Sequence, residues 1–416
     1  MILSIKRFTE NYLREVLIVN LFVASISISS ITNYSLRSFI LKIAASGILW
    51  FMIVIDIKKT KFNYKSFVKS RYFKRLLTIL IVFSLLLSTT LSYSFNPLFG
   101  VQKLIGFIIS TIPTIIAFSY LLKTNNDTRY KVFIITITVA AVFSVFVILI
   151  LQPFSYHDMN IKDFTSWSHV IYGRFIGTVY LIILFYYLNT KSKTLITYIP
   201  LAFAVIIIGV YLSGLRAMIL GVLILTPITL LISFLQKKVS IKRIAGLVVA
   251  IIVSATVIIT VMPGNEILTG RLENLQDIED LQFNSDGPIL TRYHFYKVSL
   301  EIIREYPILG VGLGGFRNYK NDIATQTRKY PHNLFLEFAV ELGIPGILFC
   351  AFLLYLIFSS AKKASPEVFI FFLFALWLAM FSKDIATQSL LWIGLAFVGM
   401  GRGGFRTKEA EVLINE

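Results

Sequence analysis

The sequence predicts an all-α polytopic membrane protein with about 12 transmembrane helices and one long external loop that contains a short amphipathic helix. Apolar runs of membrane-spanning length recur along most of the 416-residue chain. Only 15% of the residues are charged and 56% are hydrophobic, whereas soluble domains are about a quarter charged. Basic residues collect in short loops between the apolar runs, as the positive-inside rule expects.

The predicted spans alternate with these basic loops. If every span crosses, the basic loops all fall on one side, which is the cytoplasm, and both chain termini lie there. The first apolar run has no convincing small-residue cleavage site after it, so we expect the first helix to be retained. To within a few residues, the spans lie at 16–33, 38–56, 76–94, 102–122, 131–151, 169–188, 197–213, 216–235, 244–262, 333–360, 367–382 and 385–401.

Two loops fall on the opposite, external side: a shorter one near 152–168 and a much longer one. A loop as long as the second is uncommon unless it carries structure of its own. Within it, residues 291–306 have amphipathic helical spacing, and we expect a helix on the outer rim of the bundle. The predicted organisation is transmembrane helices 1–9 over 1–262, a long periplasmic or external loop over 263–331, transmembrane helices 10–12 over 332–401, and a cytoplasmic tail over 402–416.

The net charge of +18 does not indicate a nucleic-acid partner, because the positive-inside distribution accounts for it. The single cysteine, Cys350, lies in an apolar run and is interpreted as a small hydrophobic residue. The sequence has no metal-ligand spacing such as His-Glu-x-x-His. We therefore expect neither a metal nor another cofactor.

The glycine run YPILGVGLGGF includes Gly310, Gly312 and Gly315 at the spacing of a dinucleotide fingerprint. That fingerprint requires a preceding strand and a βαβ unit. This run follows a helix-like segment, and the predicted topology places it outside the cell. We interpret it as a turn-rich segment whose glycines allow positive φ and close backbone approach.

The segment YPHNLFLEFAVELGIPG places a histidine at the start of a predicted span. Pro331 suits the first helical position, so His332 and Asn333 would lie in the first turn. Amide groups there attract anions, and the positive helix end disfavours imidazolium, so His332 should stay neutral and accept a proton. Glu337 and Glu341 follow on nearly the same face. Carboxylates at that depth need partners, and we expect them to hold Arg or Lys side chains of neighbouring helices.

Several arginines lie on the predicted external side. Arg216 opens a span after the tight turn SGLRAMIL, and Arg292 lies in the long loop ahead of its predicted helix. Arg317 and Arg328 flank the segment that leads to His332. Snorkelling to lipid headgroups is the alternative role for Arg216. A guanidinium grips phosphate bidentately, so these arginines with a neutral histidine suggest binding of a phosphorylated lipid and proton removal from an acceptor.

The strings YPILGVGLGGFRNY and YPHNLFLEFAVELGIPG resemble the signature of the O-antigen ligase and polymerase family of bacterial envelope glycosyltransferases. SGLRAMIL resembles the family's Ser-x-Arg-Gly/Ala turn, with Leu215 as an extra residue before Arg216. The specific matches cover 213–217 and 292–346; elsewhere only the number of spans and the long external loop agree.

This resemblance implies an enzyme of the bacterial inner membrane, with its active site on the periplasmic or external face. It would move a glycan en bloc from undecaprenyl diphosphate to an acceptor sugar, inverting the anomeric centre without a metal. The resemblance assigns the diphosphate to Arg216 and Arg292 and the catalytic base to His332. If His332 is not the base, we expect Glu337 to be the next candidate. Further substrate-binding residues are predicted to be Arg317, Arg328, Asn333, Gly312 and Gly314.

Two acceptors stay open within this family: another lipid-linked repeat unit for a surface polysaccharide polymerase, or the lipid A core for a ligase. We favour the polymerase, on the family's general abundance of polymerases alone. A transporter or flippase of lipid-linked glycan is the alternative from another class, and it would be expected to place charges within several spans. A non-catalytic envelope scaffold would leave the arginines and His332 unexplained.

Overall fold

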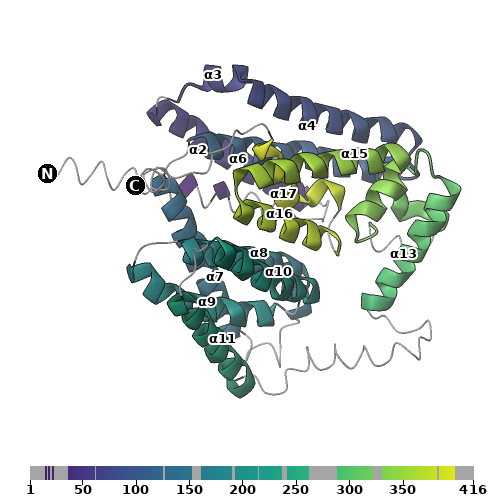
Figure 1. Cartoon of the computed structure of the whole chain (residues 1–416). Coiled ribbons are helices and arrows are strands. Elements are labelled where there is room, and N and C mark those ends of the chain that lie inside the picture. The colour runs from purple at the N-terminus through teal and green to yellow at the C-terminus, as the bar shows by residue number, and fades with distance from the viewer. Residues whose placement is uncertain are drawn as a thin grey trace. The chain divides into compact units, whose positions relative to one another are not determined.

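In the computed structural model, every regular element of the part of the chain that it describes is a helix (Figure 1). No strand occurs within those residues, which confirms the all-α fold class. Predictions for residues 402–416 and for most of the first span lie outside them. The described residues are 15, 17–18, 21–22, 36–60, 62–124, 127–151, 161–189, 193–213, 215–236, 241–261, 288–321, 330–381 and 384–398.

Five of the described helices are long and apolar enough to cross a membrane. Three further apolar helices are shorter, at Phe133–Val147, Tyr198–Leu212 and Pro366–Ala379. The total number of about 12 transmembrane spans remains a prediction. The five long helices are Phe39–Thr60, Arg71–Tyr93, Pro97–Lys123, Arg216–Leu235 and Leu334–Lys363.

The chain divides into two compact units, which we describe separately. The first combines residues 1–132 with 286–416, and the second consists of residues 133–285. Helix α7 (Asp127–Leu151) begins in the first unit and continues into the second.

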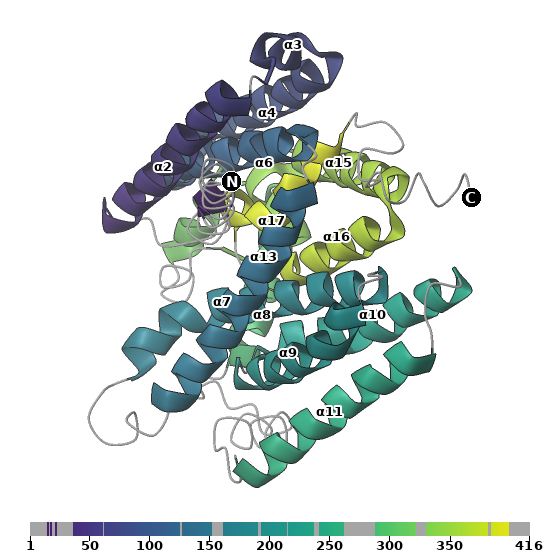
Figure 2. The ribbon, with the colours of Figure 1, turned by 90° about the vertical axis from the view of Figure 1, so that its left-hand side faces the viewer.

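The second unit is built from four further helices after α7. Helix α9 packs against both α8 and α11 (Figure 2), and Tyr180 of α8 donates or accepts a hydrogen bond with Thr226 of α10 at 3.0 Å. Helix α8 begins at Ile161, so part of the loop predicted at 152–168 is helical instead. The helices are α8 (Ile161–Asn189), α9 (Lys193–Leu212), α10 (Arg216–Leu235) and α11 (Ile241–Val261).

The first unit joins the N-terminal helices to the C-terminal third of the chain. Its elements are α2 (Leu36–Thr60), α3 (Tyr64–Lys69), α4 (Arg71–Thr89), η1 (Thr90–Tyr93), α5 (Pro97–Gly106), the π-turn η2 (Phe107–Thr111), α6 (Ile112–Thr124), α13 (Pro288–Glu305), η4 (Gly315–Asn321), α15 (Leu334–Ala364), α16 (Pro366–Ala379), η5 (Ile385–Thr387), α17 (Ser389–Trp392) and η6 (Ile393–Phe397).

Aromatic side chains far apart in the sequence form the centre of this unit. The ring of Phe83 lies 4.9 Å from that of Phe107 and 5.6 Å from that of Trp392, measured between centroids. It also stacks on Phe338 at 6.1 Å. These contacts join α4, η2, α15 and α17, and edge-to-face and offset ring pairs of this kind add about 0.5–1.5 kcal/mol each beyond burial.

The predicted span at 385–401 is wrong as a continuous helix. The chain there forms the short pieces η5, α17 and η6, with non-helical backbone at Gln388. Asp384 caps η5 by accepting from the Thr387 amide at 2.9 Å, and Trp392 Nε1 donates to the Ile385 carbonyl at 2.6 Å. The segment is buried in the unit, which is where irregular backbone is tolerated in a membrane protein.

A buried ion cluster ties α5 to α15. Lys103 Nζ lies 2.6 Å from Glu337 Oε1 and 2.7 Å from Glu341 Oε2, and all three side chains are 0% exposed. Glu337 Oε2 also accepts a hydrogen bond from the Ile385 amide at 3.0 Å. The expectation that the two glutamates hold a basic side chain of a neighbouring helix is therefore confirmed.

We predict that Lys103→Met destabilises the protein strongly, because it leaves two carboxylates buried without their cation. Breaking a buried pair in this way costs about 3–5 kcal/mol. The check is the apparent melting temperature and yield of the purified protein in detergent. Adding Glu337→Gln and Glu341→Gln to Lys103→Met should restore part of the loss. Lys362→Met, at an exposed position of α15, is the matched control, and equal stability of Lys103→Met and this control would contradict the prediction.

Candidate active site

The predicted amphipathic helix at 291–306 is confirmed as α13. Its apolar stripe faces inward: Phe295 and Ile302 are 0% exposed and Val298 is buried. These side chains form a cluster that also includes Val340 of α15, and α13 packs on α15 (Figure 1). The described part of the long predicted loop thus carries structure of its own.

The glycine run after α13 turns with positive φ at alternate residues: Gly310 (68°), Gly312 (76°) and Gly314 (79°). Other residues rarely adopt this conformation. A Cβ at Gly310 would lie 2.4 Å from the Val340 carbonyl oxygen. One at Gly314 would lie 2.6 Å from the backbone nitrogen of Gly100. The glycines are therefore required because the backbone here lies close to α15 and α5. This confirms the interpretation of the run as a turn-rich segment.

Hydrogen bonds hold this run between the segment that leads into α5 and the N-terminal part of α15. The Val311 amide donates to the Val340 carbonyl at 2.8 Å, and the Phe95 amide donates to the Val311 carbonyl at 3.0 Å. Ser94 Oγ donates to the Leu313 carbonyl at 2.8 Å. Gly312 and Gly314 are buried in this contact, and their predicted part in binding substrate stays a prediction.

His332 precedes helix α15 instead of lying in its first turn, which corrects the predicted helix start at Pro331. Asn333 is the N-cap: its Oδ1 accepts hydrogen bonds from the amides of Phe335 (3.0 Å) and Leu336 (3.2 Å). Asparagine is among the strongest N-caps, so the helix begins after it. Two of the first-turn amides expected to attract an anion are therefore engaged by the protein.

The backbone at His332 is left-handed, with φ of 60°. Non-glycine residues adopt this conformation infrequently, although histidine and asparagine do so more readily than most. The imidazole stacks on Phe295 of α13 with centroids 5.9 Å apart and planes 3° apart. Tyr330 contacts it at 4.4 Å. Two aromatic rings and a fixed backbone thus set the orientation of the half-buried His332 side chain.

Arg292 lies one helical turn before Phe295 on α13 and is half-buried. Residues three apart on a helix are neighbours, with Cβ atoms about 5–6 Å apart. Arg292 therefore lies next to Phe295 on α13, and the Phe295 ring stacks on His332. Arg292 and the oriented imidazole of His332 are thus linked through Phe295, and together they define the candidate site.

Arg216 belongs to the second unit, where it begins helix α10 after a short turn. Ser213 Oγ shapes this turn by donating to the Val210 carbonyl at 2.8 Å and accepting from the Leu215 amide at 3.3 Å. A cation at a helix N-terminus is disfavoured by the helix dipole. The position of Arg216 therefore favours an anion nearby.

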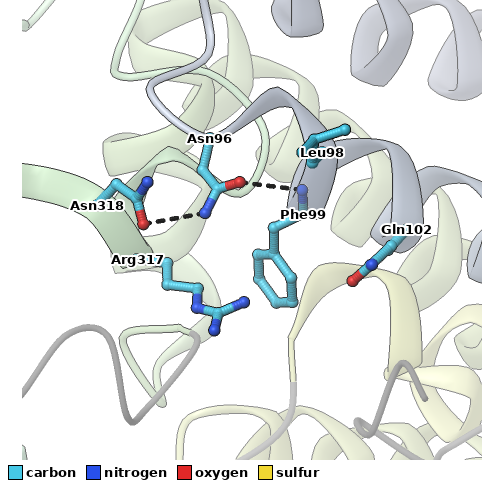
Figure 3. A pocket seen from close by; sticks show the side chains of 6 residues that line it. All are labelled: Asn96, Leu98, Phe99, Gln102, Arg317 and Asn318. Atoms are coloured by element: carbon cyan, nitrogen blue, oxygen red, sulfur yellow. Dashed lines mark hydrogen bonds between the residues drawn. The ribbon is translucent and has the colours of Figure 1, made fainter.

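The two remaining predicted arginines lie in the segment before His332. Arg328 falls outside the described residues. Arg317 is on η4, where its guanidinium carbon lies 5.1 Å from the centroid of the Phe99 ring (Figure 3). On the same turn, Lys320 donates to Glu305 Oε1 at 3.0 Å, and this hydrogen bond lowers the pKa of the exposed Glu305 carboxyl.

Sequence reasoning missed three residues that support the site: Phe295 and Tyr330 as the rings that orient His332, and Lys103 as the partner of the glutamates. A lone lysine within an apolar span was a signal for Lys103, because such a residue needs a partner. The rings carried no comparable signal. Among the described residues, no three His, Cys, Asp or Glu side chains are grouped so as to hold a metal ion.

The left-handed backbone predicts which substitutions the His332 position tolerates. His332→Asn should fold with nearly wild-type stability, because asparagine adopts positive φ readily. His332→Val should be less stable than His332→Asn by about 1–2 kcal/mol, the cost of this conformation for residues with a Cβ clash. Melting temperatures of both variants in detergent give the comparison. A valine variant as stable as the asparagine variant would contradict the observed backbone.

Comparison with known proteins adds a match over part of this region. The family model described as O-antigen ligase matches residues 201–351. That range includes Arg216, Arg292, Arg317 and His332 but not Lys103. No curated protein matches the chain. Over residues 201–351, the family match confirms the resemblance to the O-antigen ligase and polymerase family that the sequence motifs indicate.

Proposed function

We propose that this protein moves a glycan en bloc from undecaprenyl diphosphate to an acceptor sugar at the outer leaflet of the bacterial inner membrane. The family match supports the broader class, an O-antigen ligase-type or polymerase-type membrane glycosyltransferase. The observation that carries the proposal is the oriented His332 beside α13. Phe295 and Tyr330 fix its imidazole. Phe295 lies one helical turn from Arg292 on α13.

In the proposed reaction, an acceptor hydroxyl attacks the anomeric carbon of the donor sugar. His332 takes the hydroxyl proton as the new C–O bond forms. The bond between the anomeric carbon and the diphosphate oxygen breaks, and undecaprenyl diphosphate leaves with the electron pair. A single displacement of this kind inverts the anomeric centre, and a positioned base contributes typically ~10²–10⁴-fold to the rate.

The leaving diphosphate gains negative charge as the bond breaks, and arginines stabilise that charge in this proposal. A guanidinium is planar, stays charged at working pH and binds phosphate oxygens in pairs. We assign Arg216 and Arg292 to this role, so that fixed cations act where a metal ion would otherwise be needed. Arg328 and Asn333 are proposed to bind substrate nearby.

Glu337, the other candidate for the base, is a poor alternative on structural grounds. Its side chain is 0% exposed, with one oxygen on Lys103 and the other on the Ile385 amide. A carboxylate held in this way has no route to an acceptor hydroxyl without loss of the ion cluster. His332 therefore remains our assignment for the base.

For the acceptor, we keep the polymerase of a surface polysaccharide as the favoured role, with ligation to lipid A core as the alternative. Glycan gels separate the two after deletion of the gene. Lipid-linked polymer that accumulates while the core lacks all chains identifies a ligase. A single repeat unit on the core identifies a polymerase.

His332→Asn should lower turnover by about two to four orders of magnitude while donor binding persists, because the amide cannot take a proton. Transfer from a synthetic undecaprenyl-linked donor by purified protein is the assay. A variant with the wild-type rate would remove His332 from the mechanism.

Arg216→Ala should lower turnover by about 10²–10³-fold, the usual effect of losing one donor to a developing anion. Arg216→Lys should recover only part of the loss, because it keeps the charge without the planar fork. Lys242→Ala, at an exposed position of the same unit, is the matched control and should be fully active. Full activity of the alanine variant at normal protein level would mean that Arg216 only reaches to lipid headgroups.

A further inference from the structure

A polar groove of about 410 Å³ lies between the start of α5 and η4 (Figure 3). This volume falls within the ~300–1,000 Å³ typical of small-molecule sites. Asn96, Gln102, Asn318 and Arg317 contribute polar side chains, and Leu98 and Phe99 contribute apolar ones. Both walls belong to the first unit, and the α5 wall lies outside the part of the chain that matches the family model.

The position of Arg317 in this groove is set by an aromatic ring. Its guanidinium carbon lies 5.1 Å from the Phe99 centroid, and Figure 3 shows the two side chains next to one another. Phe99 is 2% exposed, so the ring serves as a support for the guanidinium and not as an open stacking surface. A guanidinium held by its face keeps its N–H groups at the edge of the plane, where they suit an anion.

The amides are also held in place. Asn96 Oδ1 accepts from the Phe99 amide at 3.1 Å, and Asn96 Nδ2 donates to Asn318 Oδ1 at 3.0 Å. Each primary amide offers two donors and two acceptor lone pairs, so both keep further hydrogen-bonding capacity. Gln102 adds a third amide from the exposed face of α5. Groups that both donate and accept match sugar hydroxyls, which do the same.

The charge of the groove favours a different ligand from a diphosphate. Among the described residues that line it, Arg317 is the one charged side chain. A diphosphate carries more negative charge than one guanidinium compensates, whereas one carboxylate is matched by it. Neutral amides with a single cation therefore favour a sugar residue with one negatively charged substituent.

The groove is also joined to the candidate active site through packed rings. Phe316, the neighbour of Arg317 in the chain, packs edge-on against Phe295 at 5.8 Å. Phe295 in turn stacks on His332. A ligand on Arg317 would therefore be held on the same rigid cluster that orients the proposed base.

We propose that this groove is a glycan-binding subsite that holds a sugar residue bearing one carboxylate, with the carboxylate on Arg317 and the hydroxyls on Asn96, Gln102 and Asn318. This proposal rests on the proposed glycosyl transfer and adds the place and chemistry of one saccharide contact. The test below separates the two glycans that could supply this sugar, the acceptor and the donor.

The test is steady-state transfer by the full-length protein with lipid-linked donor and acceptor isolated from the source cells, each varied in turn. Arg317→Gln should raise KM about ten-fold for the substrate that occupies the groove, with kcat unchanged, because a charge-assisted hydrogen bond is lost. A raised KM for the acceptor assigns the groove to it, and a raised KM for the donor assigns the groove to the donor. Lys297→Gln, at an exposed position of α13, is the matched control.

A second arm tests the charge. A disaccharide of glucuronic acid and N-acetylglucosamine should inhibit wild type more strongly than the same disaccharide with glucose in place of glucuronic acid. Arg317→Gln should abolish this difference. Equal effects of the two disaccharides on wild type would overturn the assignment of a carboxylate.

Gln102→Ala provides an independent variant at an exposed position, in case Arg317→Gln does not fold. It should raise the same KM by a smaller factor. Unchanged KM values for both substrates in the folded variants, or a fall in kcat alone, would overturn the subsite. The proposed function fails separately, if His332→Asn retains turnover.

Discussion

The first unit depends on one interaction, the ion cluster of Lys103 with Glu337 and Glu341. All three side chains are fully buried, so each charge requires the others, and removal of one partner leaves an uncompensated charge. The cluster fixes α15 against α5 and, through the Ile385 amide, the irregular segment after α16. His332 lies five residues before Glu337, and Gln102 of the groove is the neighbour of Lys103. The geometry of both proposed sites therefore rests on the same buried contact.

The buried cluster also determines where charged side chains of the first unit lie. The carboxylates of Glu337 and Glu341 are buried in the bundle and paired with Lys103. Arg292 and Arg317 lie on other elements of the unit, α13 and η4. In the proposed function, these guanidinium groups bind anionic groups of the substrates.

Much of this arrangement was predictable from local sequence patterns. The amphipathic stripe gave α13, alternate glycines gave the positive-φ turns, and two carboxylates in an apolar run required a basic partner. The partner itself was not predictable, because Lys103 meets the glutamates only through tertiary packing. The start of α15 depended on competition between Pro331 and the stronger cap, Asn333. The segment at 385–397 has enough apolar residues for a span, but its backbone breaks at Gln388 where polar groups bond within the protein.

The proposed function requires the candidate site to face the outside of the cell. The most direct measurement is labelling of a single cysteine at position 297, an exposed site on α13, in a chain whose buried Cys350 is replaced by alanine. A membrane-impermeant maleimide should label this Lys297→Cys variant in intact spheroplasts as fully as after lysis. Labelling that appears only after lysis would place α13 in the cytoplasm and contradict the account of a glycan transfer site at the outer leaflet.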